Sequence, residues 1–393
     1  MANPRPRFSR EEYGARIAKT RAAMDGAGID LLIASDPSNM AWLTGYDGWS
    51  FYVHQCVLLG GDGDPVWCGR EMDGQGAKRT VFMADDDIEG YPDHYVQSTE
   101  RHPMDYFAGV IEARGWAGGT IGVEMDNYWY TAAAHEALVS HLPNATFHNA
   151  NALVNWQRVV KSSAEIDYMT AAARIVEAMH ARVFEVMEPG MPKNAMAAEI
   201  LDVATRGVDG FGGDYAAFMP MFPSGADASA PHLTWDERPF NADEGTFFEL
   251  GGCYRRYHCP LSRTIYLGKP PQVWRDAEAA LLDGIEAALE VMRPDRTCEE
   301  VEAAWRAAIA RHGLGKESRC GYSIGLSYPP DWGERTLSLR PGDTTELVPN
   351  MTIHLMPGLW FDDWGLEITE SVRITDSGAE PFCDTPRKLL VKD

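Results

Sequence analysis

The most informative part of the chain is the segment TFFELGGCYRRYHCPLSRT, which runs from Thr246 to Thr264. It predicts a buried strand, a hairpin that contains glycine and a second strand. Glu249 follows two phenylalanines in the first strand. A carboxylate is costly to bury unless it is paired or used in chemistry. Glu249 is therefore either a functional group or the partner of a nearby arginine: Arg255, Arg256 or Arg263.

Two similar halves surround this segment. Each half predicts a long helix that ends at a Met-x-Pro sequence, a second helix and then strands. This repeat favours a pseudo-twofold core with a cleft between the halves, although two ordinary amphipathic helical hairpins would produce the same pattern. The predicted long helices start at Ser162 and near Val273 and end at Met187 and Met292, and the second helices span residues 194–206 and 297–311.

Residues 1–155 alternate helix and strand signals, which favours an α/β domain. A capping box at Ser9 predicts a helix that ends near Gly28. A further helix is predicted at residues 132–142, and short strands at residues 31–34, 56–59 and 121–124. No G-x-G-x-x-G follows any of these strands, so we do not expect a dinucleotide site. Residues 157–161 are interpreted as a linker to the second domain.

The composition excludes several classes of partner. The chain has 393 residues, with 58 acidic against 35 basic side chains and a formal charge of −23. Nucleic acids and anionic membranes bind through clustered Lys and Arg, so neither is expected, and the acidity is interpreted as a solvated surface. No apolar run approaches the roughly 18–20 residues of a membrane span. With no signal core and no C-x-x-C pair, we expect a reduced, cytoplasmic protein.

The central hairpin resembles the metal-binding hairpin of the pita-bread family, which comprises methionine aminopeptidases, Xaa-Pro peptidases and creatinase. The family motif reads D-x-G-x-x-Y-x-x-Y-x-x-D-[IL]-[ST]-R-T. The linker also resembles the start of the family's catalytic domain. The resemblance implies a creatinase-like α/β domain over residues 1–155 and an α+β pita-bread catalytic domain over residues 156–393, with an internal pseudo-twofold repeat. The motif residues kept in register are Gly251, Tyr254, Tyr257, Leu261, Ser262, Arg263 and Thr264.

The chain departs from the family at the positions that hold metal there. Only the first of the five positions keeps a carboxylate, and divalent metals need several oxygen or imidazole donors. The resemblance therefore implies neither the two-metal mechanism nor any other cofactor. A different site built from Glu367, Glu370, His258 and His354 is a less favoured alternative. The five positions carry Glu249, Pro260, Tyr322 (in G-Y-S-I-G), Met356 (before Pro-Gly) and Thr369. The last of these lies in the family motif G-[IV]-R-[IV]-E-[DN], where this chain reads G-L-E-I-T-E from Gly365 to Glu370.

One family feature survives upstream of the hairpin. The segment Ser224-Gly225 to Pro231-His232 is similar to the family's S-G-x-x-x-x-x-P-H, which carries a catalytic histidine. Histidine is the side chain most easily poised for proton transfer near neutral pH. Read without the family, His232 is a histidine on a loop rich in small residues.

Within the family, the chain most resembles the ectoine hydrolases. The features that carry this likeness are Glu249, His232, Tyr322 and the aromatic run from Gly45 to Tyr52. The resemblance implies a metal-independent hydrolase that opens the cyclic amidine ectoine to an N-acetyl-diaminobutyrate. The alternatives are a creatinase-type hydrolase of another small amidine or guanidine compound, a peptidase, which lacks its metal centre here, and a non-catalytic binding module.

The same resemblance suggests a role for each candidate residue toward a zwitterionic small substrate. Glu249 acts as nucleophile or as the base that activates water, and His232 passes a proton to the departing ring nitrogen. Arg319 or Lys316 binds the substrate carboxylate, with a solvated surface position as the alternative for each. Tyr322 donates a hydrogen bond, Trp360 walls the pocket unless it belongs to the core, and Glu370 is a second partner for the amidinium.

The aromatic run near the N-terminus is the last candidate. In creatinase-like relatives the N-terminal domain of one subunit caps the active site of the other. This implies a homodimer in which Trp49, Phe51 and Tyr52 lie at the mouth of the partner's pocket, where aromatic rings suit a flat cation. Without the family, the same residues predict only an aromatic-rich strand edge or loop.

Overall fold

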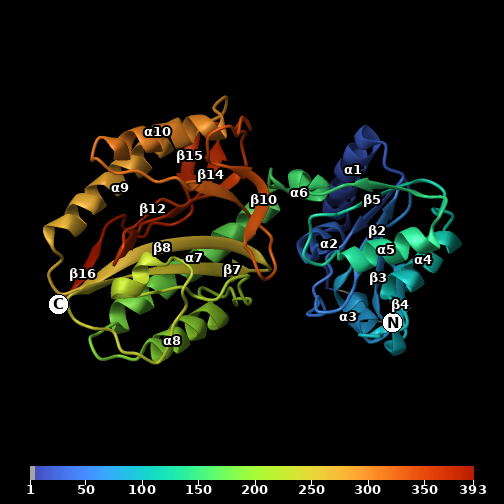
Figure 1. Ribbon diagram of the computed structural model, residues 1–393, viewed down its shortest axis with the longest axis horizontal. Helices are drawn as coiled ribbons and strands as arrows, with labels where there is room; N and C mark the ends of the chain where they lie inside the picture. The colour runs from blue at the N-terminus through green and yellow to red at the C-terminus, as the bar shows by residue number, and fades with distance from the viewer. Residues whose placement is uncertain (1–4) are drawn as a thin grey trace. The chain divides into compact units, whose positions relative to one another are not determined.

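The computed structural model describes residues 5–393, and the chain divides into two compact units between Arg158 and Val159. The division falls inside the predicted linker, at residue 158 rather than 155. Figure 1 shows the helices and strands of each unit and labels most of them. No helix in the described residues combines the length and the apolar character that a membrane span requires.

The first unit is an α/β layer structure, as its alternating signals predict. Its six-stranded sheet has the order β4-β3-β2-β1-β5-β6, with β1, β5 and β6 parallel and β2 antiparallel to β1 and β3. The strands are β1 (Leu31–Ala34), β2 (Cys56–Gly60), β3 (Val66–Arg70), β4 (Ile88–Tyr91), β5 (Thr120–Val123) and β6 (Thr146–Asn149). The helices are α1 (Arg10–Ala27), α2 (Pro37–Thr44), α3 (Glu71–Thr80), α4 (Pro103–Ala113), α5 (Ala132–His141) and α6 (Leu153–Arg158).

Helices cover both faces of this sheet because its central strands are buried on both sides. Leu31 and Ile33 pack with residues of α4 and α5, whereas Leu32 and Ala34 pack with residues of α1, α2 and α3. The predicted start of α1 is confirmed, since Ser9 accepts a hydrogen bond from the backbone N–H of Glu12 at 3.2 Å. Its predicted end is also confirmed, because Gly28 takes the left-handed conformation that closes helices.

The second unit contains the predicted repeat of two helices followed by strands. Both long helices end at the predicted Met-x-Pro sequences, and their C-cap residues are Met187 and Met292. Full capping boxes at Ser162 and Thr297 start α7 and α10. The helices are α7 (Ser163–Val186), α8 (Lys193–Arg206), α9 (Gln272–Val291) and α10 (Cys298–Ala310), with a short 3-10 helix η3 (Gly225–Ser229).

The strands of the second unit lie between two pairs of helices (Figure 1). A three-stranded sheet has the order β16-β8-β7, a five-stranded sheet β10-β9-β11-β14-β15, and β12 pairs with β13. The strands are β7 (Glu244–Tyr254), β8 (Tyr257–Leu267), β9 (Gly321–Ile324), β10 (Gly333–Ser338), β11 (Thr352–Leu355), β12 (Gly358–Trp360), β13 (Gly365–Glu367), β14 (Glu370–Thr375), β15 (Gly378–Pro381) and β16 (Leu390–Lys392).

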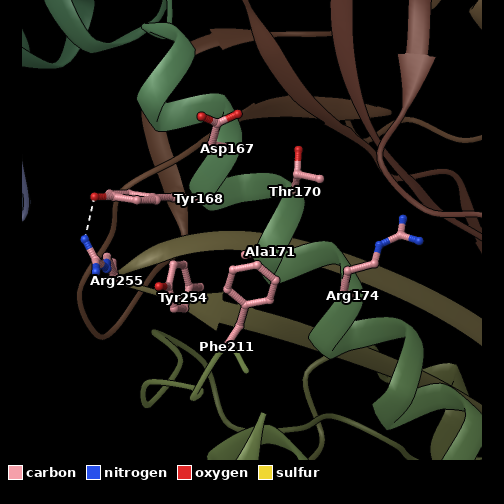
Figure 2. A pocket seen from close by; sticks show the side chains of 8 residues that line it. All are labelled: Asp167, Tyr168, Thr170, Ala171, Arg174, Phe211, Tyr254 and Arg255. Carbon is pink, nitrogen blue, oxygen red and sulfur yellow. Dashed lines mark hydrogen bonds between the residues drawn. The ribbon is translucent and has the colours of Figure 1, made fainter. Parts of the chain in front are cut away.

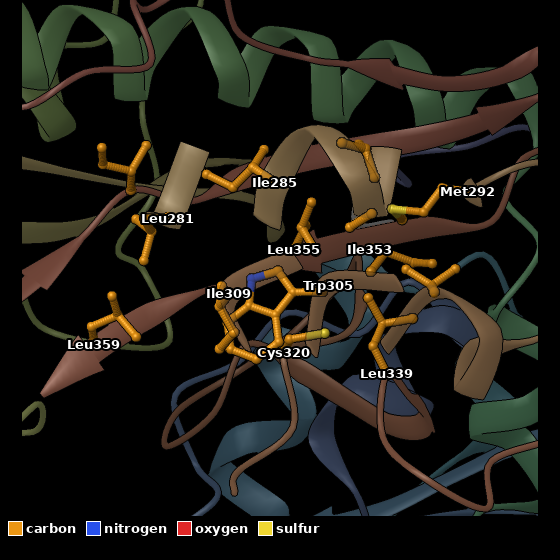
Figure 3. Packing of buried hydrophobic residues seen from close by; sticks show 14 of the residues in the cluster. Leu281, Ile285, Met292, Trp305, Ile309, Cys320, Leu339, Ile353, Leu355 and Leu359 are labelled. Carbon is orange, nitrogen blue, oxygen red and sulfur yellow. The ribbon is translucent and has the colours of Figure 1, made fainter. Parts of the chain in front are cut away.

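Two hydrophobic clusters attach these helix pairs to the strands. One joins α7 and α8 to the face of β7 and β8 that carries Phe248, Leu250 and Leu261. The other joins α9 and α10 to the larger sheet, with Trp305 packed among Ile353, Leu355 and Cys320 in Figure 3. The opposite face of β7 belongs to neither cluster, and it is the face that carries Glu249.

The predicted hairpin is present, but its turn is not made by glycine. Arg255 and Arg256 both have positive φ angles, of 50° and 69°, and connect β7 to β8 as a two-residue turn. Gly251 and Gly252 lie inside β7 instead. A Cβ on Gly252 would stand 2.0 Å from the Ala172 carbonyl oxygen, so glycine is required there because the backbone of α7 crosses the strand closely.

Candidate active site

Glu249 lies in the middle of β7 and points away from the α7–α8 cluster. It is opposite Ser262 of β8, and its neighbours Phe248 and Leu250 face the helices. On the Glu249 side of β7, Trp332 packs so closely that a Cβ on Gly251 would stand 2.7 Å from its ring. The side chain of Glu249 is therefore directed into the space between the β16-β8-β7 sheet and the strands that follow α10.

The Glu249 carboxylate is buried and has no neutralising partner of its own. Only 4% of the residue is exposed, and among residues 5–393 no hydrogen bond or ion pair to its side chain is present. Burial raises its pKa well above the ordinary value, the nearby Glu367 raises it further, and Lys316 opposes the shift. The alternative in which Glu249 pairs with an arginine of the hairpin is not what the structure shows: Arg263 binds Glu370, and Arg255 binds Tyr168.

Glu367, at the end of β13, brings a second carboxylate to Glu249. Hydrogen bonds fix its backbone to β8: Thr264 Oγ1 donates to the Glu367 carbonyl at 2.8 Å and accepts from its N–H at 2.9 Å. Burial raises the pKa of Glu367 to about 7, against the stabilising effects of Ser262 and Lys316 on its charged form. Both carboxylate oxygens are buried without a hydrogen-bond partner among the described residues.

Lys316 is the cation of this site. It is 8% exposed, its ammonium donates to the Met356 carbonyl at 3.1 Å, and it lies 4.5 Å from the centre of the Trp360 ring. Burial lowers its pKa to about 8, while the charges of Glu367, Cys320 and Glu249 act in the opposite direction. The structure thus places Trp360 beside Lys316, and of the two candidate cations Lys316 is buried whereas Arg319 is exposed.

Tyr322 belongs to a closed hydrogen-bond network beside Glu249. Its hydroxyl accepts from Trp332 Nε1 at 2.8 Å and lies 3.1 Å from His354 Nδ1. The other ring nitrogen of His354 lies 2.9 Å from Thr369 Oγ1, which also accepts from the Ser262 N–H at 2.7 Å. Burial lowers the pKa of His354 to about 3, so this ring is neutral and has one donor nitrogen and one acceptor nitrogen.

These contacts test whether the site fits the metal pair of the wider family. Two of the matched positions, Tyr322 and Thr369, are joined through His354, Pro260 has no donor side chain and Met356 offers only a thioether. Within the described part of the chain, no group of three His, Cys, Asp or Glu side chains is arranged to hold a metal ion. The donor set does not fit a two-metal centre.

His232 lies on the loop after η3 and is exposed. The segment that leads into this loop is tied to β7, because Met221 pairs with Glu249 and Ser224 with Thr246 through isolated bridges. In residues 5–393 no hydrogen bond or ion pair joins His232 to Glu249. The structure therefore ties the segment before His232 to β7, the strand that carries Glu249, but shows no hydrogen bond between the two side chains.

Glu370 and Arg319 have partners other than Glu249 and Glu367. Glu370 accepts from Arg263 at 2.6 Å and from Arg387 at 3.0 Å, and Arg263 lies on the helix-facing side of β8. The structure thus gives Glu370 an internal ion pair. Arg319 is exposed, donates to Ser338 Oγ at 3.1 Å and lies 4.4 Å from the centre of the Tyr322 ring.

The aromatic run of the first unit forms an exposed loop. Trp49 and Tyr52 are 60% and 62% exposed, and the rings of Trp49 and Phe51 contact each other with centroids 4.7 Å apart. Tyr52 accepts a hydrogen bond from Arg70 at 3.2 Å. Large aromatic rings that are exposed together are typical of interaction surfaces.

A separate pocket of about 390 Å³ lies on the outer side of α7, away from the residues above. Figure 2 shows its aromatic wall, in which Tyr168, Tyr254 and Phe211 approach one another and Arg255 donates to Tyr168. None of the residues predicted for catalysis or binding lines it.

The residues that sequence reasoning underrated are Glu367, Lys316, Ser262 and Trp332. The sequence placed Glu367 only in a less favoured alternative site, and it marked Ser262 only as a residue that matches the family motif. One signal was available, because Glu367 stands where the family motif has arginine. No comparable signal marked Trp332, whose contact with Tyr322 depends on how β10 folds back toward β9.

Comparisons with known proteins agree with this two-part organisation. The creatinase/prolidase N-terminal domain matches residues 16–160, and metallopeptidase family M24 matches residues 167–376. The chain is 57% identical over 392 residues to an ectoine hydrolase of Halomonas elongata, covering 98% of each protein. The structure is similar to dipeptidase PepE from Mycobacterium ulcerans, with a TM-score of 0.80, 25% identity and coverage of 98% and 99%. A prolidase from Thermococcus sibiricus shares the fold, with a TM-score of 0.83, 19% identity and coverage of 97% and 99%.

Proposed function

Because the chain belongs to metallopeptidase family M24 and carries a creatinase/prolidase N-terminal domain, we propose that it is a hydrolase that opens the cyclic amidine ring of ectoine to N-acetyl-2,4-diaminobutyrate, without a metal. The observation that carries the proposal is Glu249, a buried carboxylate with no neutralising partner where the family has its first metal ligand. The likeness to the ectoine hydrolase of Halomonas elongata supports the choice of substrate.

The chemistry of an amidinium suits a site that lacks metal donors. The carbon between its two nitrogens is already electrophilic, so it needs no Lewis acid to polarise it. Glu249 acts on this carbon, either directly as a nucleophile or as the base that takes a proton from water. One oxygen from water is added, one ring C–N bond breaks, and the departing nitrogen takes up a proton, so that the products are an amide and an amine. His232, on a loop anchored to β7, passes that proton.

Other residues recognise the rest of the zwitterion. Lys316 or Arg319 binds the carboxylate, Tyr322 donates a hydrogen bond, and Trp360 forms a wall of the pocket. In this proposal the protein is a cytoplasmic homodimer, and Trp49, Phe51 and Tyr52 of one protomer cover the active site of the other. Their exposure supports this arrangement.

The test uses purified protein that has been treated with a chelator and incubated with ectoine. We expect ring opening, followed by NMR of the acetyl group, at the same rate with and without chelation. Glu249→Gln keeps the size of the side chain but cannot act as base or nucleophile, so it should bind ectoine and lose about 10³-fold or more in kcat. Near-normal turnover by Glu249→Gln would exclude this assignment, and loss of activity on chelation would exclude the metal-independent reaction.

A further inference from the structure

The proposed site contains buried polar atoms that have no hydrogen-bond partner among residues 5–393. Both carboxylate oxygens of Glu367 and the indole nitrogen of Trp360 have no hydrogen-bond partner among the described residues, and the nearby Ser262 hydroxyl favours the charged form of Glu367. Buried polar groups are almost always paired, and each one left unpaired costs free energy. Several such atoms gathered at one place indicate a position that a polar ligand completes.

These atoms lie around one point because three strands bring them there. Ser262 is opposite Glu249 across the hairpin, and Glu367 is opposite Gly358, two residues before Trp360, in the β12–β13 pair. A Cβ on Gly358 would stand 2.8 Å from Glu367 Cγ and 2.7 Å from the Trp360 ring, so these side chains meet across a glycine. Thr264 fixes the backbone of Glu367 on β8. The carboxylate is thus held in place before any ligand arrives.

The charges of the cluster indicate what kind of ligand completes it. Two carboxylates, Glu249 and Glu367, face the ammonium of Lys316, and Asp331 adds negative charge near Glu249. The fully ionised cluster therefore carries more negative than positive charge. Moreover, Glu367 reverses the sign of the arginine that the wider family motif carries at this position. A ligand with one positive charge and N–H donors would satisfy both the charge and the unpaired oxygens.

We propose that Glu367 is a second substrate-binding carboxylate of the active site, which accepts a hydrogen bond from an N–H of the cationic amidine and thereby holds the amidine carbon against Glu249. The identity of the substrate rests on the proposed function, whereas the requirement for a cationic N–H donor rests on the cluster itself. Glu367 takes the role of amidinium partner that Glu370 was expected to fill, because Glu370 is already bound by two arginines.

The first measurement compares kinetics and stability of Glu367→Gln with those of the wild type. The variant loses the charge but keeps the shape, so KM for ectoine should rise by about 10-fold to 100-fold, since hydrogen bonds to charged groups are the stronger ones. The ligand-free variant should unfold at the same temperature as the wild type or higher, because it removes an unpaired buried charge. A purely structural role predicts the opposite, namely a lower unfolding temperature with KM unchanged, and that result would overturn the proposal.

Two further variants make the comparison specific. Glu302→Gln removes a buried carboxylate that pairs with Arg306 on α10, outside the site, and should leave KM and kcat unchanged. Glu367→Asp keeps the charge on a shorter side chain, and its KM should lie between those of the wild type and Glu367→Gln. If Glu367→Asp instead raises KM more than Glu367→Gln does, side-chain length and not charge is what matters, and the proposal fails.

A second measurement separates this inference from the proposed function. Acetamidinium chloride is a minimal amidinium probe, and its binding is followed by isothermal titration calorimetry. We expect it to bind the wild type and Glu302→Gln and to bind Glu367→Gln at least about 10-fold more weakly. If the wild type binds acetamidinium in this Glu367-dependent way but does not open ectoine, the proposed function fails while the role of Glu367 stands. If ectoine is opened and Glu367→Gln binds both compounds like the wild type, the role of Glu367 fails alone.

Discussion

At the scale of single residues, the chemistry of the site depends on buried carboxylates that outnumber the cations beside them. Glu249 and Glu367 are buried together with one ammonium, that of Lys316. Each carboxylate raises the cost of ionising the other, and burial adds to that cost. Elsewhere in the same unit, the buried Lys161 and Glu334 are joined at 2.7 Å in an ordinary ion pair. The active-site carboxylates lack such a partner, which is the property expected of groups that await a cation.

This electrostatic state predicts how stability depends on pH. The pKa of Glu367 is raised from 4.5 to about 7, so between these values the folded protein holds a proton that the unfolded chain has released. The ligand-free protein should therefore lose stability as pH rises through this window. The groups that face Glu367 are Glu249, Lys316 and the Ser262 hydroxyl. The pKa of Glu249 is also raised, so Glu249 changes stability with pH in the same direction as Glu367. The lowered pKa of Lys316 changes stability only above about pH 8.

The measurement is urea unfolding of the wild type and Glu367→Gln at pH 5 and pH 7.5. The difference in unfolding free energy between the two proteins isolates Glu367 from other groups that titrate in this range. We expect Glu367→Gln to become more stable relative to the wild type by about 1–3 kcal/mol on going from pH 5 to pH 7.5, since one pKa unit corresponds to about 1.4 kcal/mol. A difference that does not change with pH would show that Glu367 ionises normally.

At the scale of elements, the hairpin β7–β8 separates structural from chemical side chains by alternation. Phe248, Leu250 and Leu261 face α7 and α8, and Glu249 and Ser262 face the site. The two adjacent glycines of β7 have different roles. Gly251 lies under the Trp332 ring on the site face, and Gly252 lies under the backbone of α7 on the helix face.

A substitution at Gly252 tests this close approach. The Cβ of Gly252→Ala would stand 2.0 Å from a backbone oxygen of α7, so either the helix or the strand has to move. We expect the unfolding free energy to fall by about 1–3 kcal/mol, as for other overpacked cores, measured by urea denaturation. Gly212→Ala is the control in the same unit, because a Cβ there meets nothing within 4 Å. Equal stability of the two variants would contradict a tight α7–β7 contact.

At the scale of the whole molecule, we propose that the aromatic loop of one protomer covers the active site of the other. In the proposed homodimer, Trp49 and Tyr52 cover the pocket of the other protomer, which would explain why large rings in the first unit are left exposed. The site in the second unit would then be complete only after association, and each dimer would contain two composite sites.

Mixed dimers test this arrangement directly. Glu249→Gln and the double variant Trp49→Ala/Tyr52→Ala are coexpressed with different affinity tags, and the mixed dimer is isolated by two successive purifications. If the loop caps the partner's pocket, the mixed dimer has one fully intact site and should show about half of the wild-type activity. If the loop caps its own pocket, the mixed dimer has no intact site and should be no more active than the average of the two parent proteins.

The sequence determined the local structure well because local structure depends on nearby residues. Capping residues at Ser162 and Thr297 fix where α7 and α10 begin, and Met-x-Pro sequences fix where α7 and α9 end. The motif likeness also identified the family and made Glu249 the first candidate for catalysis. The turn of the hairpin was less predictable, since the glycines were needed for close packing and two arginines adopted the positive φ angles instead.

Only the tertiary structure decided which side chains meet around Glu249. The partners come from segments far apart in the chain: Ser262 on β8, Lys316 before β9, Trp360 on β12 and Glu367 on β13. Burial and charge compensation are properties of that assembly. Sequence alone therefore left Lys316 and Arg319 as alternatives and favoured Glu370 over Glu367, whereas the fold neutralises Glu370 with Arg263 and leaves both oxygens of Glu367 unpaired. The sequence by itself specified the elements and the first carboxylate; the second carboxylate and its counter-charge depend on long-range packing, because a pKa is set by everything that surrounds the group in space.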